Sequence, residues 1–152
     1  MVKLILPEKT PLFASFDPGD STGIVLVENS KIVGRDTMGY EEFFSTAAEF
    51  GWSHVQEFVV EQFRLYPWKA NKLGFDGLIP VRVIGALELL ARWQNKHIEF
   101  IDAVAAKQFC SDARLREVGW WSSLQTKHEC DAARHALYYL IVRRDKRRQA
   151  QR

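Results

Sequence analysis

The sequence predicts one α/β domain: a mixed five-stranded sheet, an antiparallel meander followed by parallel strands, with helices on both faces. Three observations predict this fold class. Three β-like runs joined by tight turns come first. Strands then alternate with helical patterns, which favours parallel pairing and helices on both faces of the sheet. The 152 residues, 47% of them hydrophobic, can fill one core but are too few for a second full domain.

The strands are identified as short apolar runs bounded by turn residues. Asp17-Pro-Gly-Asp20 is a dense turn signal after the first run, and Asn29-Ser30 separates the second run from the third. The fourth run contains Phe58, Val59 and Val60, which are too apolar for an exposed edge strand. Strands are therefore expected at residues 12–16, 22–28, 31–37, 55–61 and 98–101.

The helices are identified from apolar periodicity and from capping residues. Pro80 suits the first turn of one helix, and Asp102 and Ser111 suit the N-cap positions of two more. Thr126 and Glu129 form a capping box, which predicts that the last helix begins there. Helices are therefore expected at residues 41–50, 80–91, 103–109, 112–119 and 127–144.

Charge divides the chain into a domain at residues 1–142 and a basic C-terminal tail at residues 143–152. The net charge is +2, but the tail holds five Arg and one Lys against one Asp, so the domain itself carries −3. Two interpretations of the tail stay open. It contacts DNA electrostatically, or it is a solvated helix end whose cations complement the helix dipole.

The sequence favours a soluble protein of the cytoplasm. Cys110 and Cys130 show no disulfide pattern, which suits a reducing compartment. The first apolar stretch, residues 1–7, is too short for a signal peptide, and no run of ~18 uncharged apolar residues is present. No association with a membrane is expected.

Two carboxylates directly follow apolar strands. Asp17 lies where the first strand meets its glycine turn, and Glu61 follows Val60. Taken singly, each has an ordinary explanation, as a turn aspartate and as a strand-end glutamate facing water. A carboxylate at the mouth of a core, however, needs a compensating cation. The glycine loop beside Asp17 would also let a phosphate approach the backbone.

The last predicted helix carries a stripe of ionisable side chains. His128, Asp131 and His135 have the spacing i, i+3 and i+7, so they share one face of the helix. Two interpretations of His128 and Asp131 stay open: site residues, or an exposed histidine and an aspartate that the helix dipole favours. His135 is either a group that supports the site residues or, as we expect, a partly buried structural histidine; Glu129 is expected to be a capping residue.

These side chains are the donors expected around two divalent metal ions. In such sites the ions lie ~4 Å apart and contact the attacking and leaving oxygens of a phosphodiester. Carboxylates suit Mg²⁺, and an imidazole among them shifts the preference toward Mn²⁺. The predicted ligands are Asp17, Glu61, His128 and Asp131. No cysteine or histidine spacing typical of a zinc cluster is present.

Five motifs occur in the order found in a known family of nucleases. Residues 16–23 are Phe-Asp-Pro-Gly-Asp-Ser-Thr-Gly, similar to an Asp-Pro-Gly-x-x-x-Thr-Gly motif, and residues 59–62 are an apolar strand ending in Glu-Gln. A helix with small residues at 85–91, then Lys107, and finally His-x-x-Asp-Ala at 128–132 follow. In order, and over nearly the whole chain, these motifs resemble those of the RuvC-type Holliday-junction resolvases.

The resemblance implies a ribonuclease H-like fold, a homodimer and resolution of four-way (Holliday) DNA junctions with two Mg²⁺ ions per active site, for which Mn²⁺ can substitute. Carried over by position, Asp17, Glu61, His128 and Asp131 would be the catalytic metal ligands, with His128 a ligand or an acid–base group. The short interval between the first two ligands leaves the dimer-forming helix open. The compact size resembles phage-encoded members, which act in the host cytoplasm and are often less selective among branched DNAs.

Residues 63–77 alternate aromatic and cationic side chains and show no regular period. This pattern favours stacking on unpaired bases, with the cations on phosphates. For Phe63, packing into the core is an equal alternative, whereas Trp68 is expected at the surface. The predicted DNA-binding residues are Phe63, Arg64, Tyr66, Trp68, Lys69 and Lys72, together with Lys107 from the family motif.

Three other functions share some of these sequence features. An actin-like or sugar-kinase ATPase would repeat the aspartate–glycine turn, and no second copy follows residue 23, which excludes that fold and a nucleotide cofactor. A catalytically inactive junction-binding module would lack a ligand, whereas all three carboxylates are present. A flap, fork or RNA–DNA hybrid nuclease on the same fold stays open.

Overall fold

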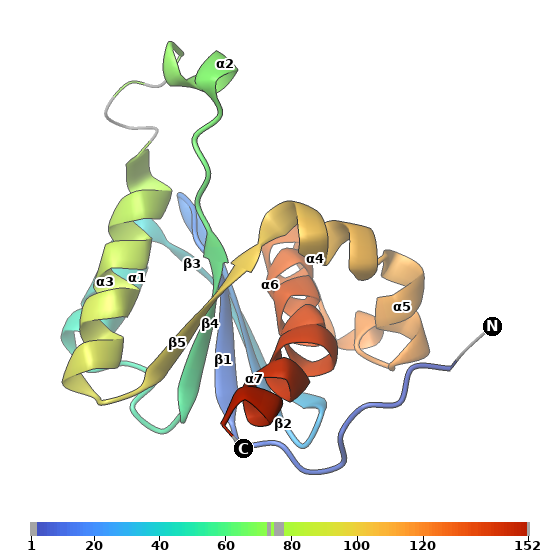
Figure 1. Ribbon diagram of the computed structural model, residues 1–152. Helices are drawn as coiled ribbons and strands as arrows, with labels where there is room; N and C mark the ends of the chain where they lie inside the picture. Colours follow the sequence, from blue (N-terminus) through green and yellow to red (C-terminus); the bar gives the residue numbers. More distant parts are fainter. Residues whose placement is uncertain (1–2, 73, 75–77, 152) are drawn as a thin grey trace.

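The computed structural model describes residues 3–72, 74 and 78–151 and contains one mixed sheet (Figure 1). Strand order is β3-β2-β1-β4-β5. The first three strands are antiparallel, whereas β4 and β5 run parallel to β1. The predicted fold class is confirmed. The strands are β1 (Phe13–Asp17), β2 (Ser21–Glu28), β3 (Lys31–Gly39), β4 (Glu57–Gln62) and β5 (His97–Asp102).

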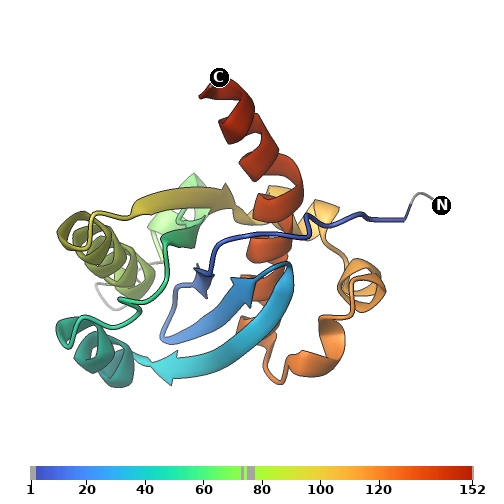
Figure 2. The same cartoon turned by 90° about the horizontal axis from the view of Figure 1, so that it is seen from below.

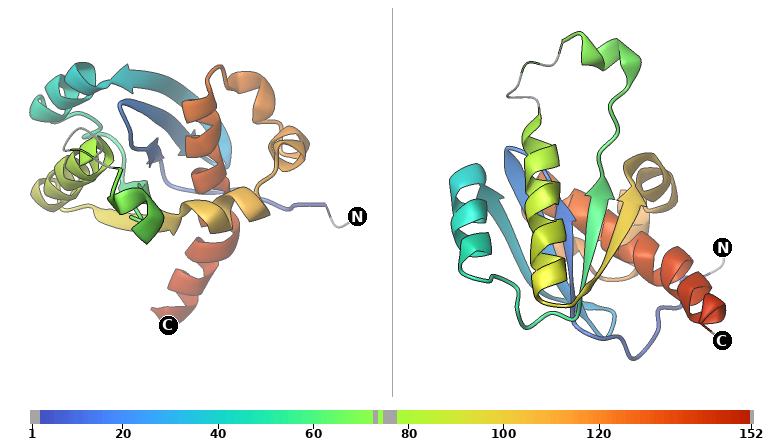
Figure 3. Two further views of the ribbon diagram at one scale, coloured as in Figure 1. Left: turned by 90° about the horizontal axis from the view of Figure 1, so that it is seen from above. Right: turned by 60° about the vertical axis from the view of Figure 1, so that its left-hand side comes forward.

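Helices cover both faces of the sheet, as Figures 2 and 3 show. The helices α1 and α3 lie on one face, while α4, α5 and α6 lie on the other. None of the helices in the described part of the chain is both long and apolar enough to cross a membrane. The helices are α1 (Tyr40–Ala48), α2 (Pro67–Ala70), α3 (Ile79–Trp93), α4 (Ala103–Phe109), α5 (Asp112–Glu117), α6 (Lys127–Tyr138) and α7 (Arg144–Ala150).

Alternation along the strands divides the interior into two cores. Phe16 and Phe58 pack with Phe43 of α1 and Leu87 of α3 on one face. On the other face, buried side chains such as Val59 pack against α6, which contributes mainly alanines. Because consecutive strand residues point to opposite faces, one apolar run such as that of β4 supplies both cores.

The predicted helix caps are confirmed. The Asp102 carboxylate accepts a hydrogen bond from the amide of Ala105 over 2.9 Å, and the Ser111 hydroxyl accepts one from Arg114. Thr126 and Glu129 form the expected capping box at the start of α6. Each cap satisfies amide groups that the first turn of a helix leaves without partners.

Several predicted element boundaries differ from the structure by one or two residues. Strand β4 begins at Glu57, because the amide of Val55 is already bonded to the carbonyl of Trp52 in a turn. Helix α1 ends at Ala48, before a turn. Within the predicted loop 63–77, the structure contains the short helix α2; residues 73 and 75–77 lie outside the described part of the chain.

The last helix extends beyond its predicted end. It passes through a π-helical turn (Tyr139–Arg143) and continues as α7. Arg144 is buried and donates to the carbonyl of Lys9, and Arg147 forms an ion pair with Glu57. The basic segment therefore lies at the end of the sheet where β4 begins, as Figure 1 also shows.

Candidate active site

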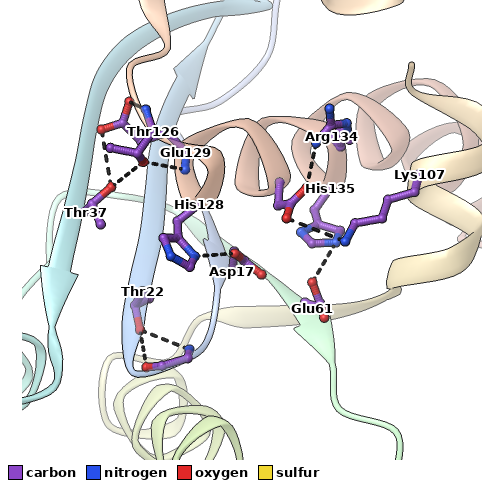
Figure 4. A network of polar contacts seen from close by, with 12 residues as sticks. Asp17, Thr22, Thr37, Glu61, Lys107, Thr126, His128, Glu129, Arg134 and His135 are labelled. Carbon is purple, nitrogen blue, oxygen red and sulfur yellow. Dashed lines mark hydrogen bonds and ion pairs between the residues drawn. The ribbon is translucent and has the colours of Figure 1, made fainter. Parts of the chain in front are cut away.

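The two strand-end carboxylates lie at the same edge of the sheet. Strands β1 and β4 are parallel neighbours, so the ends that carry Asp17 and Glu61 emerge together. The start of α6 crosses this edge, and Nδ1 of His128 lies 3.3 Å from Oδ2 of Asp17 (Figure 4). Three elements that are distant in sequence thus meet around one group of polar side chains.

Small residues allow α6 to lie this close to the sheet. A Cβ atom on Gly23 would lie 2.1 Å from the carbonyl oxygen of His128, so any larger residue there would push the helix away. The hydroxyl of Ser15 donates to the carbonyl of Ala132 over 2.8 Å. Gly23 of the first motif therefore allows the helix that carries Asp131 to pack closely against the sheet.

Glu129 fixes the start of α6 more firmly than a capping box alone. Its side chain is buried, accepts hydrogen bonds from the amides of Gln125 and Thr126, and contacts Thr37 of β3. Arg35 of β3 lies 3.5 Å away and partly balances its charge. These contacts tie the first turn of the helix to the sheet and so set the position of His128.

The pKa values of Asp17 and Glu61 move in opposite directions. Burial raises the pKa of Asp17 to about 8; a hydrogen bond with Glu61 and the negative charges of Glu61 and Asp131 add to the increase, which Lys107 opposes. Burial also raises the pKa of Glu61, but contacts with His135, Asp17 and Lys107 outweigh it, so the net shift is downward. Of the two carboxyl groups, Asp17 therefore favours its protonated form and Glu61 its ionised form.

His135 has a closer relation to the site than the sequence indicated. It is fully buried, whereas partial burial was expected, and its Nε2 lies 3.2 Å from Oε2 of Glu61. Among the described residues, neither ring nitrogen has a well-aligned hydrogen-bond partner. The i+4 spacing from Asp131 was the available signal, because it places both side chains on the face of α6 that meets the site.

Asp131 is buried, and its carboxylate lies next to two cationic side chains. Its Oδ1 accepts a hydrogen bond from Nη1 of Arg134 over 2.6 Å, and its Oδ2 lies 3.5 Å from Nζ of Lys107 on α4. Lys107, predicted to bind DNA, therefore lies beside a carboxylate of the site, with its side chain half exposed. Arg134 was not singled out from the sequence, because its contacts depend on how α4 and α5 pack.

The donor chemistry of these side chains fits divalent metal ions. Three carboxylates supply hard oxygen ligands, and His128 supplies a nitrogen. Burial, and after it the hydrogen bond with Glu61 and the charges of Glu61 and Asp131, raise the pKa of Asp17 despite Lys107, so added positive charge would be favourable here. Over residues 3–72, 74 and 78–151, no three such side chains are close enough to enclose an ion as they stand. The donor types therefore suit a divalent cation, whereas their spacing in this structure is not that of a ligand set.

The aromatic and cationic residues after Glu61 extend away from the sheet (Figure 1). The rings of Tyr66 and Trp68 stack with centroids 4.7 Å apart, and Trp68 is 68% exposed, as expected. Arg64 is held at the base of the segment by an ion pair of 2.8 Å with Asp102. Lys72 is exposed.

A cavity of about 310 Å³ lies between this segment and α4, directly beside Glu61. Phe63 is half-buried and lines this cavity, so the alternative that it packs into a core is wrong. Lys69 and Tyr66 line it as well. The cavity therefore connects Glu61 to the aromatic segment.

Comparisons with known proteins identify the fold. No family model and no curated protein matches the sequence. The structure is similar to Thermus thermophilus RuvC in complex with a Holliday junction substrate, with a TM-score of 0.68 and 16% identity over 90% of this chain and 97% of that one. It is also similar to a second T. thermophilus RuvC structure, with a TM-score of 0.57 and 16% identity over 84% and 94% of the two chains. The chain therefore has the RuvC-type, ribonuclease H-like fold that its motifs predict.

Proposed function

We propose that this protein is a metal-dependent endonuclease that resolves four-way junctions and cleaves other branched DNA. One observation carries the proposal: Asp17, Glu61 and Asp131 meet at one edge of a RuvC-type sheet, where burial and then the neighbouring carboxylates raise the pKa of Asp17 to about 8. A similar structure holds a Holliday junction substrate, which supports branched DNA as the substrate class.

Asp17, Glu61, Asp131 and His128 are the proposed ligands of two Mg²⁺ ions, for which Mn²⁺ substitutes. When bound, such ions supply an activated water and charge stabilisation for the leaving 3′-oxygen of a phosphodiester. Glu61 is kept ionised by its neighbours and so is ready to bind a cation. His128 contacts Asp17 through Nδ1 and acts as a ligand or as an acid–base group.

The segment after Glu61 and Lys107 are the proposed DNA contacts. The exposed Trp68, stacked on Tyr66, offers an aromatic face on which an unpaired base at a branch point can stack. Arg64, Lys69 and Phe63 line the adjoining cavity, Lys72 is exposed in the same segment, and Lys107 supplies positive charge beside Asp131. Linear duplex DNA offers no unpaired bases, so this arrangement favours branched substrates.

A homodimer is proposed because two cuts on opposite strands require two active sites. The outer side of α3 supports this, since it exposes Val81, Leu89 and Trp93. Phe50, also exposed, lies against Trp93 with ring centroids 5.9 Å apart. Apolar side chains gathered on one surface are typical of an interface between protein chains.

The test compares wild type with Asp17→Asn on four-way, flap and linear duplex DNA in Mg²⁺. We expect the variant to lose about 10³-fold in cleavage rate, because a metal ligand contributes several kcal/mol to the transition state. Asp20→Asn is the matched control, since Asp20 lies in the same turn with an exposed side chain. Wild-type cleavage by Asp17→Asn would overturn the site, and cleavage of flaps alone would identify a flap nuclease instead.

A further inference from the structure

We infer that Arg134 is a positioning residue that holds the Asp131 carboxylate in the orientation needed for metal binding. The inference rests on the proposed function, because Asp131 is one of the proposed ligands. Arg134 follows Asp131 by one helical turn of α6, and its side chain is only 16% exposed. Arg134 therefore contacts the carboxylate from the protein interior and not from the solvent-exposed side of the site.

All three nitrogens of the Arg134 guanidinium have a partner. Nη1 donates to Oδ1 of Asp131 over 2.6 Å, Nε donates to the carbonyl oxygen of Cys110 over 3.1 Å, and Nη2 forms a short contact with Asp112. Cys110 is the C-cap of α4, and Asp112 is the first residue of α5. The guanidinium thus connects the corner between α4 and α5 to Asp131.

Arg134 engages only one of the two oxygens of Asp131. Arg134 occupies Oδ1, whereas Oδ2 faces Lys107 at 3.5 Å. With one oxygen held, rotation of the carboxylate about its own axis is restricted, so Oδ2 stays on the side where a cation binds. Residues that orient metal-binding carboxylates in this way typically change metal affinity about 10- to 100-fold when they are replaced.

Geometry, and not charge, is the property that Arg134 contributes. Its positive charge is already balanced by Asp112 on the side away from the site. A lysine would keep the charge but could not donate in three fixed directions, because an ammonium group lacks the planar fork of a guanidinium. The two properties can therefore be separated by substitution.

The experiment measures Mn²⁺ affinity of the full-length protein by isothermal titration calorimetry, with Arg134→Lys, Arg134→Gln and Asp112→Asn. We expect both Arg134 variants to bind Mn²⁺ about 10- to 100-fold more weakly, and Asp112→Asn to lose less because Arg134 keeps two of its partners. Arg143→Gln is the control, since it removes an arginine that is paired with Glu99. Circular dichroism at the assay temperature checks folding, and Asp112→Asn retains the test if an Arg134 variant does not fold.

Wild-type Mn²⁺ affinity in Arg134→Lys would overturn the inference, whatever Arg134→Gln does, because charge alone would then suffice. Asp131→Asn in the same titration separates the two proposals. If Asp131→Asn binds Mn²⁺ as wild type does, the proposed metal site itself is wrong. If Asp131→Asn weakens binding while Arg134→Lys does not, only the positioning role fails.

Discussion

Strand β4 carries a glutamate near each end, and the two have opposite surroundings. Glu57, at the first residue, accepts a hydrogen bond from the hydroxyl of Tyr139 over 2.7 Å and pairs with Arg147 at 2.9 Å. Glu61, four residues later, lies beside Asp17 and 3.2 Å from His135. The last helix contacts the two glutamates through His135 and Tyr139, which are also four residues apart. The packing of this helix against β4 therefore creates the surroundings of both glutamates.

The difference is one of charge balance. At the Glu57 end, arginine and tyrosine side chains of the same chain satisfy the carboxylate, and the pKa of Tyr139 is raised by burial and by its bond to Glu57. At the Glu61 end, several carboxylates gather around too little positive charge, and the pKa of Asp17 rises mainly through burial and then through these neighbours. The carboxylate of Glu57 is balanced by partners within the chain and so has a structural role. The carboxylates at the Glu61 end lack enough cationic partners, which is why we propose that they bind a cation.

The largest expected effect comes from removing the charge of Glu61 by mutation. Glu61→Gln should lower cleavage of a four-way junction by about 10³-fold, because a charged ligand is lost. Its free energy of unfolding should also fall, because contacts with His135, Asp17 and Lys107 favour the ionised form of Glu61 in the folded chain. Rate measurements on junction DNA and urea denaturation check both parts.

Glu57→Gln is the matched control at the opposite end of the same strand. It should lose about 1–3 kcal/mol of stability, because the buried Tyr139 hydroxyl and Arg147 lose a charged partner, while cleavage stays within a small factor of wild type. If Glu57→Gln stopped cleavage without loss of stability, the assignment of a structural role to that end of the strand would be wrong.

The sequence predicts the role of Glu61 at one end of β4 but not the role of Glu57 at the other. Glu61 was predicted as a site residue because it directly follows three apolar residues, and Asp17 because it precedes a glycine turn. Caps and strand order were also predictable, since they depend on neighbours in the chain. Nothing local marks Glu57, whose partners Tyr139 and Arg147 lie more than eighty residues away.

The contacts behind the carboxylates were missed for the same reason. Arg134 and His135 are adjacent in sequence, yet their partners Cys110, Asp112 and Glu61 belong to three other segments. The π-helical turn that redirects the last helix also has no signal in a 3.6-residue pattern. Tertiary packing, and not local preference, determines these features.

Stability should depend on pH through Asp17. The pKa of its carboxyl is about 8 in the folded chain, against an ordinary value of 3.8. Between these values the unfolded chain releases a proton that the folded chain keeps, so stability should fall as pH rises from about 4 to about 8. Without metal, the melting temperature should therefore fall over this range in wild type and much less in Asp17→Asn.

Mn²⁺ should reverse this trend, because a bound cation favours the ionised carboxylates. The increase in melting temperature on adding Mn²⁺ should be larger at pH 9 than at pH 6, and small in Asp17→Asn at both. Equal pH dependence in wild type and Asp17→Asn, measured in the presence of a chelator, would contradict the charge imbalance assigned to this edge of the sheet.

The smallest effect concerns DNA binding at the two ends of the molecule. Trp68 is 68% exposed beyond the Glu61 end, whereas Arg148 is exposed on α7 near the Glu57 end. Trp68→Ala should weaken binding of a four-way junction by about 1–3 kcal/mol, the typical contribution of one stacked base, without changing stability. Fluorescence anisotropy in Ca²⁺, at one fixed salt concentration, measures it.

Arg148→Gln provides the comparison, and it also tests the two interpretations of the basic segment. Arg143, Arg144 and Arg147 are already engaged with Glu99, the Lys9 carbonyl and Glu57, so they have little freedom to bind phosphates. Arg148→Gln should therefore have a smaller effect than Trp68→Ala, and one that disappears as salt is raised. If Arg148→Gln lost as much junction affinity as Trp68→Ala, or more, DNA would extend to both ends of the sheet. The charge balance of the two ends would then not distinguish the structural end, at Glu57, from the functional end, at Glu61.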